Sequence, residues 1–315
     1  MLISEEEALS LLHRSKPVAI PTETVWGLAA RFADNRAVEQ VFTLKGRPPS
    51  NPLIIHVSSV DMVEELTVEF PEEARLLIDS FWPGGLTVVL PVVEDRVPSS
   101  VRAALPTAAF RMPDNSDTLS LIERAGPLVA PSANLSSRPS STAPHHVEHD
   151  FGSSFPILRT SCSCEKGIES TILIWKEGVW YVGRPGAVNI ADIEKVLGKA
   201  VHDLHSSTPL CPGQHFRHYS PKAQLYLHTD SWEPKEQFDG VLGFEDRTYE
   251  GAPTIITMGR STCPVSVAKR FYGALRELDD RGCTSVFVDG RIPQTVEWRA
   301  ILDRLRRACG EKTKS

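Results

Sequence analysis

The sequence predicts an α/β protein with one large unit and a second, smaller one. Short apolar runs that suit strands alternate with amphipathic stretches that suit helices. This periodicity disappears between about residues 200 and 222 and then resumes. A chain of 315 residues has the length for one or two domains. We therefore expect a first domain over 1–200, a linker over 201–222 and a small domain over 223–315.

The composition is that of an ordinary globular protein, with 41% hydrophobic and 23% charged residues. A net charge of −6 argues against a nucleic-acid footprint over the whole chain, although it allows a local basic patch. No apolar run approaches the roughly 18 residues that a membrane span needs. The first residues are acidic where a signal peptide has basic ones. We therefore expect a cytoplasmic protein without a membrane partner.

The first half of the chain begins with a capping-box pattern at Ser4 and Glu7, which predicts a helix. A strand at 17–20 follows, and Asp34 can cap a helix that ends near Lys45. The apolar segment 52–57 reads as a buried strand that contains His56. Further elements expected in order are helices near 59–66 and 71–81, strands at 86–90, 107–113 and 127–130, and a helix around 119–122 between the last two strands.

The second half begins with a hairpin, whose strands at 170–174 and 179–182 flank a Lys-Glu-Gly turn. A short helix is expected at 190–197. Beyond the linker, strands are expected at 225–227, 240–244, 254–256 and 285–288, and helices at 267–278 and 296–305. This alternation predicts a small domain with a parallel sheet.

Two early loops carry most of the polar groups that point to chemistry. The segment 21–28 (Pro-Thr-Glu-Thr-Val-Trp-Gly-Leu) leaves a strand with hydroxyls and one carboxylate, and strand-end loops carry function in α/β folds. The segment 45–52 (Lys-Gly-Arg-Pro-Pro-Ser-Asn-Pro) places two cations among rigid residues. We interpret these loops as halves of one polyanion site. Lys45 also suits a helix C-terminus for electrostatic reasons alone.

Other strand ends extend this set of polar groups. The segment 131–142 is rich in hydroxyls and follows an apolar strand, and Arg184 lies between glycine and proline. Arginine pairs with carboxylates and phosphates through two hydrogen bonds. The common nucleotide-binding loops and the serine-hydrolase elbow are absent. The remaining groups supply the positioning and charge stabilisation that phosphoryl or nucleotidyl transfer requires. Because no strong nucleophile is placed among them, they favour direct attack by a substrate. His56, alone among apolar neighbours, would otherwise be an ordinary core histidine.

A metal site is also considered, because His145, His146 and His149 fit the spacing His-x-x-Glu-His. No third ligand is evident, and the segment directly follows Pro144. A solvated polar helix is therefore the expected reading, and no protein metal ligand is predicted.

Several motifs together closely resemble the threonylcarbamoyl-AMP synthase family in its long, two-domain form. They fall in order across about 200 residues, at 21–28, 45–48 (Lys-Gly-Arg-Pro), 51–54 (Asn-Pro-Leu-Ile), 111–113 (Arg-Met-Pro), 131–134 (Pro-Ser-Ala-Asn), 170–171 (Ser-Thr), 184–186 (Arg-Pro-Gly) and 218–221 (His-Tyr-x-Pro). The resemblance implies a YrdC-like domain, a twisted open α/β sheet with a concave positive face, followed by a smaller Rossmann-like α/β domain.

The resemblance also implies the reaction. The family is an ATP-dependent nucleotidyltransferase that converts L-threonine, bicarbonate and ATP, with Mg²⁺, into threonylcarbamoyl-AMP and pyrophosphate. The product serves the N6-threonylcarbamoylation of adenosine in tRNA. Further partners implied are tRNA or the downstream threonylcarbamoyl transferase complex.

The roles of residues follow from the motif positions. The resemblance implies that threonine is held by Thr24, His56, Arg111 and Ser170. It implies that ATP is held by Arg47, Asn51, Thr107, Ser132, Ser140, Arg184 and Tyr219. It implies a polar catalytic tetrad of Lys45, Arg47, Ser132 and Asn134. Tyr219 lies in the linker, which would act as a lid and exclude water from a labile carbamate.

The chain departs from the family pattern at two positions. Trp26 stands where the family usually has tyrosine, so a role for that phenol is lost. Ser137 stands where the family tends to glycine, which bears on the nearby Ser140.

Two other functions are weighed against this one. A concave basic surface could bind double-stranded RNA or tRNA, although such binding would depend steeply on salt. A carbamoyltransferase-type enzyme would need the zinc-finger and acylphosphatase regions of larger proteins, which are absent from this sequence. The small domain could be catalytic, support a lid or dock a partner, and the basic residues from Arg304 onward are expected to form a solvated helix and tail.

Overall fold

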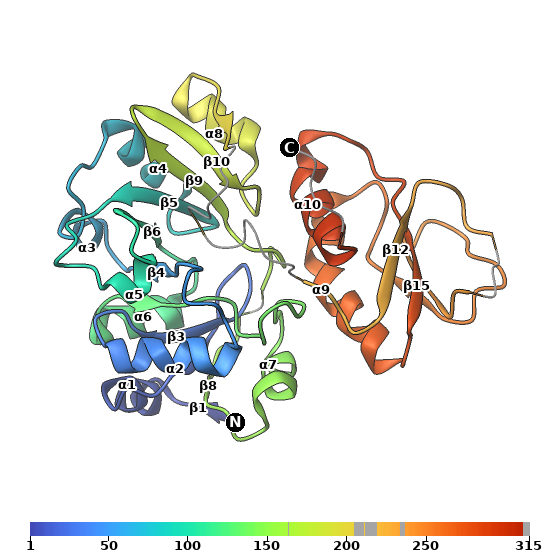
Figure 1. The fold of residues 1–315 in the computed structure, drawn as a ribbon, viewed down its shortest axis with the longest axis horizontal. Coiled ribbons are helices and arrows are strands. Elements are labelled where there is room, and N and C mark those ends of the chain that lie inside the picture. Colours follow the sequence, from blue (N-terminus) through green and yellow to red (C-terminus); the bar gives the residue numbers. More distant parts are fainter. Residues whose placement is uncertain (163, 205–210, 212–218, 234–236, 311–315) are drawn as a thin grey trace.

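The computed structural model describes residues 1–315 apart from 163, 205–210, 212–218, 234–236 and 311–315. Within the described residues, one sheet has 11 strands in the order β1-β8-β2-β3-β7-β4-β6-β5-β9-β10-β11, and a second has four in the order β12-β15-β13-β14 (Figure 1). Helices alternate with the strands in both parts. The predicted α/β class, with a large sheet and a smaller parallel one, is confirmed.

The large sheet is mixed, with parallel and antiparallel neighbours. Its strands are β1 (Leu2–Ile3), β2 (Val18–Ile20), β3 (Gly27–Arg31), β4 (Ile54–His56), β5 (Leu86–Pro91), β6 (Thr107–Arg111), β7 (Leu128–Val129), β8 (Ile157–Leu158), β9 (Thr171–Lys176), β10 (Val179–Arg184) and β11 (His202–Asp203). The predicted hairpin is β9–β10, and its turn has positive φ at Glu177 and Gly178, as a two-residue hairpin loop requires.

The helices of this part begin and end largely where the sequence places them. They are α1 (Glu5–His13), α2 (Asn35–Lys45), α3 (Asp61–Glu64), α4 (Glu72–Phe81), α5 (Ser99–Arg102), α6 (Ser116–Ala125), α7 (Pro144–Phe151) and α8 (Ile190–Leu197). Ser4 and Glu7 form the expected capping box on α1, and the Asp34 carboxylate accepts from the backbone N–H of Ala37 at the start of α2. Gly46 ends α2 with φ +60°, so Lys45 is fixed at its last turn.

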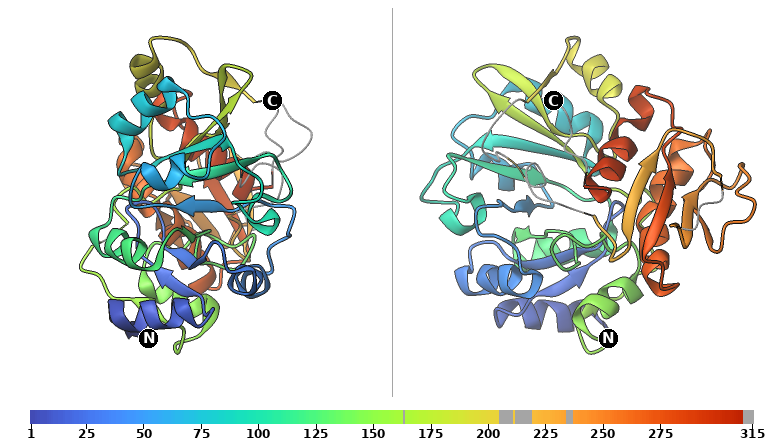
Figure 2. Two further views of the ribbon diagram at one scale, coloured as in Figure 1. Left: turned by 90° about the vertical axis from the view of Figure 1, so that its left-hand side faces the viewer. Right: turned by 45° about the vertical axis from the view of Figure 1, so that its right-hand side comes forward.

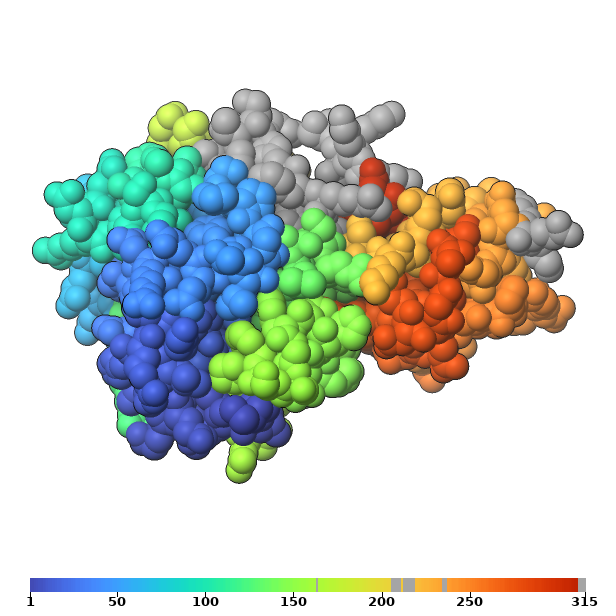
Figure 3. All heavy atoms as spheres, turned by 60° about the horizontal axis from the view of Figure 1, so that its bottom comes forward, coloured from blue at the N-terminus to red at the C-terminus, as the bar shows by residue number. Residues whose placement is uncertain are grey.

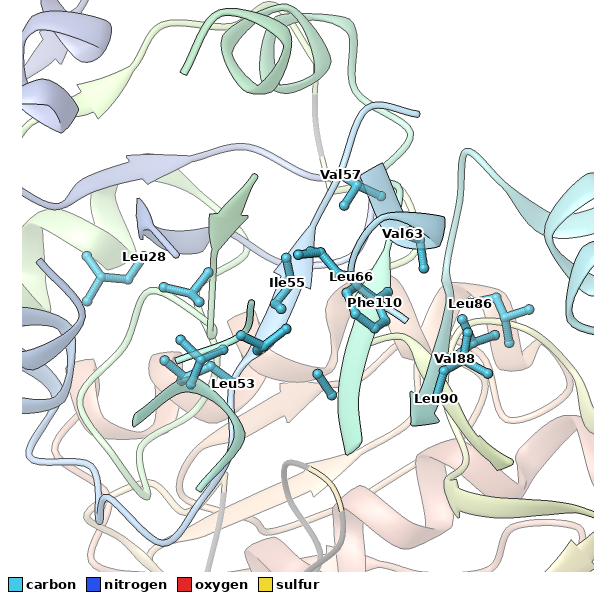
Figure 4. Packing of buried hydrophobic residues seen from close by; sticks show 14 of the residues in the cluster. Leu28, Leu53, Ile55, Val57, Val63, Leu66, Leu86, Val88, Leu90 and Phe110 are labelled. Atoms are coloured by element: carbon cyan, nitrogen blue, oxygen red, sulfur yellow. The ribbon is translucent and has the colours of Figure 1, made fainter. Parts of the chain in front are cut away.

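Alternation along the central strands separates a packed face from an open one. Ile55, Val88, Leu90 and Phe110 belong to the main core, which helices cover (Figure 4). Their neighbours along the strands, including Ile54, face the other way. On β6 this second face carries Thr107, Ala109 and Arg111 in turn, which brings chemistry-bearing side chains to the concave side of the sheet.

The smaller sheet is parallel throughout, as predicted. It contains β12 (Gln224–His228), β13 (Gly240–Gly243), β14 (Ile255–Thr257) and β15 (Ser285–Asp289), with helices α9 (Pro264–Asp280) and α10 (Arg299–Ala308) and the 3₁₀ turn η1 (Val296–Trp298). Figures 1 and 2 show α9 and α10 on the side of this sheet that faces the first domain. Among the described residues, no helix has both the length and the apolar character needed to cross a membrane.

Side chains of α9 and of the 138–150 region form one part of the contact between the two domains. Arg276 donates to both carboxylate oxygens of Asp150, at 3.0 and 2.9 Å, and Arg138 donates to Asp279 at 2.8 Å. In the space-filling view the green segment around α7 lies against the orange and red C-terminal part (Figure 3). Because the first of these pairs is nearly fully buried, the two parts form an extensive interface.

Candidate active site

The loops singled out in the sequence meet around one cavity on the concave side of the large sheet. The two early loops, the loop after β7, the start of β9 and Tyr219 all contribute to its lining. Among the residues that the structure describes, its charged lining consists of Glu169 and five cations, which are Lys45, Arg47, Arg111, Arg138 and Arg184. The interpretation of the two early loops as halves of one site is supported by this arrangement, and the excess of positive charge suits an anionic ligand.

One end of the cavity is organised by Arg111, the last residue of β6. Its Nη2 donates to the Glu23 carboxylate at 2.6 Å and its Nε donates to the carbonyl of Gly84 at 3.1 Å. Glu23 also accepts from the backbone N–H of Asp114. These contacts fix the plane of a buried guanidinium that still lines the cavity, so it can pair with a carboxylate there.

His56 lies directly beside Arg111, because β4 and β6 are parallel neighbours and pair these two residues in register. Burial, reinforced by the charge of Arg111, lowers the pKa of His56 to about 3. The ring is therefore neutral at physiological pH and can give or accept a hydrogen bond without adding charge. Thr24 lines the same end, and its hydroxyl is 2.8 Å from that of Thr22.

Of the two cations of the second loop, Lys45 is buried and Arg47 is half-buried. Lys45 donates through Nζ to the carbonyl of Ser132 and, at 2.6 Å, to that of Asn134. Burial lowers the pKa of Lys45 well below its ordinary value, and the charge of Arg47 adds to this effect. Arg47 is held by the carbonyls of Asn51 and Pro52, at 3.1 and 2.6 Å. Both cations are thus positioned by backbone oxygens rather than by carboxylates, so their charge is left for a ligand.

The loop after β7 supplies neutral polar groups. Asn134 donates to the carbonyls of Leu135 and Arg138, at 2.7 and 3.0 Å, which orients its amide. The buried Oδ1 atoms of Asn134 and Asn51 have no partner among the residues that the structure describes. A buried acceptor without a partner is costly, and because Asn134 lines the cavity, its oxygen fits a donor or a hard cation brought by a ligand. Ser132 lines the cavity beside them.

Ser170, Arg184 and Glu169 form a further wall of the cavity. Arg184 Nη2 donates to the carbonyl of Ser170 at 3.0 Å and to its hydroxyl at 3.2 Å. The Ser170 hydroxyl is also 2.8 Å from that of Thr87. Burial opposes the charge of Glu169, but Arg304 and Arg184 outweigh it and lower the pKa of this carboxyl to about 2. This wall therefore carries a fixed negative charge beside its arginine.

Not every predicted residue reaches the cavity. The lining includes Thr24, Lys45, Arg47, His56, Arg111, Ser132, Asn134, Ser170, Arg184 and Tyr219. Asn51, Thr107 and Ser140 do not line it. Thr107 shares a strand face with Arg111 but lies at the other end of β6, and Ser140 is buried behind Glu169, to which it donates at 2.6 Å. Most of the predicted lid, 205–210 and 212–218, lies outside the described residues.

The structure adds residues that the sequence did not single out. Glu23 supports Arg111, and Glu169 lines the cavity. The expectation of a solvated helix beyond Arg304 is wrong for that residue, which is fully buried and donates through Nε to Glu169 at 2.9 Å. A signal for this exists, because Arg304 lies on the same helical stripe as Ile301, Leu305 and Ala308.

The two departures from the family pattern have different consequences. Trp26 is buried in the main core and does not line the cavity. Ser137 has a φ of +71°, a left-handed conformation that suits glycine. Its carbonyl accepts from the backbone N–H of Ser220, next to Tyr219, so the strained residue lies where the linker returns to the site.

The histidine cluster is not arranged as a metal site. Among the described residues, no three His, Cys, Asp or Glu side chains are grouped as ligands. The prediction of a solvated helix is wrong for His146, which is buried and accepts through Nδ1 from the backbone N–H of Thr142 at 3.2 Å. Burial, with the charge of Arg276, lowers the pKa of His146 to about 3.

Two sequence families match the chain in succession. The family described as "Telomere recombination" matches residues 10–186, and the one described as "Threonylcarbamoyl-AMP synthase, C-terminal domain" matches residues 188–310. The protein named threonylcarbamoyl-AMP synthase in Bacillus subtilis is 36% identical over 96% of this chain and 92% of its own length. The protein of that name in Pyrococcus abyssi is 35% identical over 96% of this chain and 93% of its own.

A solved structure agrees with the arrangement of both parts. The crystal structure of P. abyssi Sua5 complexed with L-threonine is similar to this one with a TM-score of 0.89, at 33% sequence identity. The similarity covers 98% of each chain, so it includes the large sheet, the smaller sheet and their junction.

Proposed function

The chain belongs to the threonylcarbamoyl-AMP synthase family, and on this premise we propose that it forms threonylcarbamoyl-AMP and pyrophosphate from L-threonine, bicarbonate and ATP. It is a nucleotidyltransferase that serves tRNA modification. The observation that carries the proposal is a single cavity that is lined both by Arg111, held in place by Glu23, and by the further cations Lys45, Arg47 and Arg184.

Threonine binds at the Arg111 end in this account. Its carboxylate pairs with the guanidinium that Glu23 holds in place, and Thr24, His56 and Ser170 receive its polar groups. A neutral His56 suits this task, because a second positive charge beside Arg111 would be costly to bury. The threonine amine then points toward the cations in the middle of the cavity.

The reaction joins three components. The amine attacks bicarbonate and, with loss of water, gives a carbamate. A carbamate oxygen then attacks the α-phosphorus of ATP, and the bond from that phosphorus to the bridging oxygen of the β-phosphate breaks. Pyrophosphate leaves with the bonding electrons. Charge builds on phosphate oxygens during this step, so fixed cations are the main catalytic requirement.

Lys45 and Arg47 supply that charge. The carbonyls of Ser132 and Asn134 hold Lys45, and those of Asn51 and Pro52 hold Arg47, so neither has to reorganise during the reaction. Arg184, with Ser132 and Tyr219, completes the ATP side, and Asn51 and Ser140 support it from outside the lining through their contacts with Arg47 and Glu169. A lid closed over the carbamate would exclude water, which would otherwise compete for it.

Mg²⁺ accompanies ATP in this proposal. The carboxylates at the cavity, Glu23 and Glu169, are already paired with arginines, whereas the amide oxygen of Asn134 is unpartnered among the described residues. This donor set fits a magnesium ion held mainly by ATP phosphates, with the Asn134 oxygen and the Ser132 hydroxyl as protein ligands. The ion would neutralise phosphate charge. The wider setting proposed is the cytoplasm, with tRNA or the transferase complex downstream.

The proposal is tested by measuring pyrophosphate release from ATP while threonine and bicarbonate are each left out in turn. Release that requires both is the expected result. Release without threonine would point to another acceptor or to plain ATP hydrolysis. No release, together with salt-sensitive binding of RNA, would favour the RNA-binding alternative instead.

A further inference from the structure

Glu169 is the one acidic side chain among the described residues that line the cavity, and it lies where a triphosphate is proposed to bind. Its carboxylate is almost completely buried. Oε1 accepts from the Ser140 hydroxyl at 2.6 Å, and the residue that follows, Ser170, is held by Arg184. An ionised carboxylate here would repel phosphate and attract Arg184 unless something else neutralises it.

The neutralising groups come from the C-terminal domain. Arg304, on α10, donates through Nε to Glu169 Oε2 at 2.9 Å. Tyr272, on α9, donates its hydroxyl to the same carboxylate, whose two oxygens are both 2.8 Å away. Both residues are fully buried, and neither lines the cavity. They thus act on the side of Glu169 that faces away from the ligand.

The same two side chains also support Tyr219. The guanidinium carbon of Arg304 lies 5.3 Å from the centre of the Tyr219 ring, and the Tyr272 ring lies 5.4 Å from it. Tyr219 itself lines the cavity and has a φ of +68°. A left-handed tyrosine is kept in place only by surroundings that hold it firmly. We call Ser140, Glu169, Tyr219, Tyr272 and Arg304 the junction cluster.

We propose that Arg304 and Tyr272 of the C-terminal domain are positioning residues for ATP, an inference that rests on the proposed function. Arg304 cancels the charge of Glu169, so that Arg184 stays available to the phosphates. Tyr272 fixes the carboxylate, and through it Ser140. The small domain therefore completes the nucleotide side of the site from behind.

The neighbouring Arg276–Asp150 pair shows that a buried ion pair between the two parts need not act on the ligand. It also joins the two parts and is similarly buried, but neither of its residues lines the cavity. That pair has the properties of an interface contact. The junction cluster differs because its carboxylate lines the cavity and its cation does not.

The test is a double-mutant cycle on the affinity for Mg-ATP, measured by titration calorimetry on the full chain without threonine or bicarbonate. Arg304→Met should weaken ATP binding by about tenfold or more, because it leaves Glu169 charged and unneutralised. Adding Glu169→Gln to that variant removes the charge, and should restore the affinity to within about threefold of the Glu169→Gln single variant. Threonine affinity should hardly change in any of these variants.

Two further variants separate positioning from folding. Tyr272→Phe keeps the ring and removes only the hydroxyl, and should weaken ATP binding about threefold to tenfold without loss of fold. Arg247→Met removes an ion pair with Asp289 that lies wholly inside the C-terminal domain, and should leave ATP affinity unchanged.

Rescue by Glu169→Gln, together with the Tyr272→Phe effect, supports the inference. A double variant that binds ATP as weakly as Arg304→Met, or a Tyr272→Phe variant that binds it normally, overturns it. An unsubstituted protein that binds ATP but releases no pyrophosphate with both co-substrates would count against the proposed function alone, since the binding cycle still decides the inference. An unsubstituted protein that binds no ATP would overturn both.

Discussion

Two buried arginine–glutamate pairs border the cavity, and they are built the opposite way round. In the Arg111–Glu23 pair the arginine lines the cavity and the glutamate supports it from behind. In the Arg304–Glu169 pair the glutamate lines the cavity and the arginine supports it. The first pair lies within one domain, whereas the second joins two.

The partner that lines the cavity indicates what each pair does. A supported arginine presents a preorganised partner for a carboxylate, so the first pair binds a ligand directly. A supported glutamate must not bind a phosphate at all, so the second pair works by keeping its charge neutralised. Loss of Arg111 should therefore abolish a contact, whereas loss of Arg304 should create a repulsion that a second substitution can remove.

Lys45 lines the cavity but belongs to neither pair, so the effect of its loss should differ most from the effect of breaking a pair. If the pairs position ligands and Lys45 stabilises the transition state, Lys45→Ala should lower kcat by about 100-fold or more and change the KM values much less. Steady-state pyrophosphate release checks this, with thermal unfolding as the control for folding. Activity that stays within about threefold of the unsubstituted enzyme would leave Lys45 only its structural contacts with the loop after β7.

Acid should weaken the Arg304–Glu169 pair in a defined pH range. Burial opposes the charge of Glu169, but its arginine neighbours lower its pKa from 4.5 to about 2. A lowered pKa means that the pair's stabilisation is complete above pH 4.5 and is lost as the pH falls toward 2. The stabilisation at neutral pH is on the order of 3 kcal/mol.

The measurement is urea unfolding of the unsubstituted chain and of Glu169→Gln at successive pH values. Their difference in unfolding free energy should be largest at neutral pH and should close in acid. Both chains contain the buried histidines His56 and His146, so the difference isolates the glutamate. A difference in unfolding free energy that stays constant down to pH 2 would contradict the pairing of Glu169 with Arg304.

The smallest effect is expected at Ser137, beside the junction cluster. Its φ of +71° costs a serine more than a glycine. Ser137→Gly should raise the free energy of unfolding by up to about 1 kcal/mol and leave ATP affinity unchanged, because its carbonyl contact with Ser220 uses only backbone atoms. Denaturant midpoints measure the change. A lower stability would show that the left-handed backbone is not strained.

Elements with strong local signals could be predicted from the sequence. The β9–β10 hairpin, the capped α1 and α2 and the strands of the smaller sheet follow from periodicity, turn residues and caps. Strand β3 was not predicted, since Gly27-Leu28-Ala29-Ala30-Arg31 has little strand propensity. It is a strand because β2 and β7 pair with it on either side, and that information is not local.

The site residues also divide into those with a local signal in the sequence and those that depend on a distant partner. Polar residues in compact motifs, such as Lys45 and Arg47, could be predicted because their neighbours in the chain position them. The helical stripe of α10 indicates that Arg304 is buried, but its pairing with Glu169 could not be predicted, since that residue lies 135 residues away in the sequence. Burial of a charge is decided by its tertiary partner, which only the fold provides.

The most direct test of the account is a parallel titration of Arg111→Ala with threonine and with Mg-ATP. Because threonine and ATP are proposed to bind through different residues of one cavity, threonine affinity should fall by about 100-fold while ATP affinity stays within about threefold. Arg124→Ala, which removes an exposed pair with Glu5 and Glu6, is the matched control and should change neither. Loss of ATP binding with threonine binding intact would contradict the division of the site.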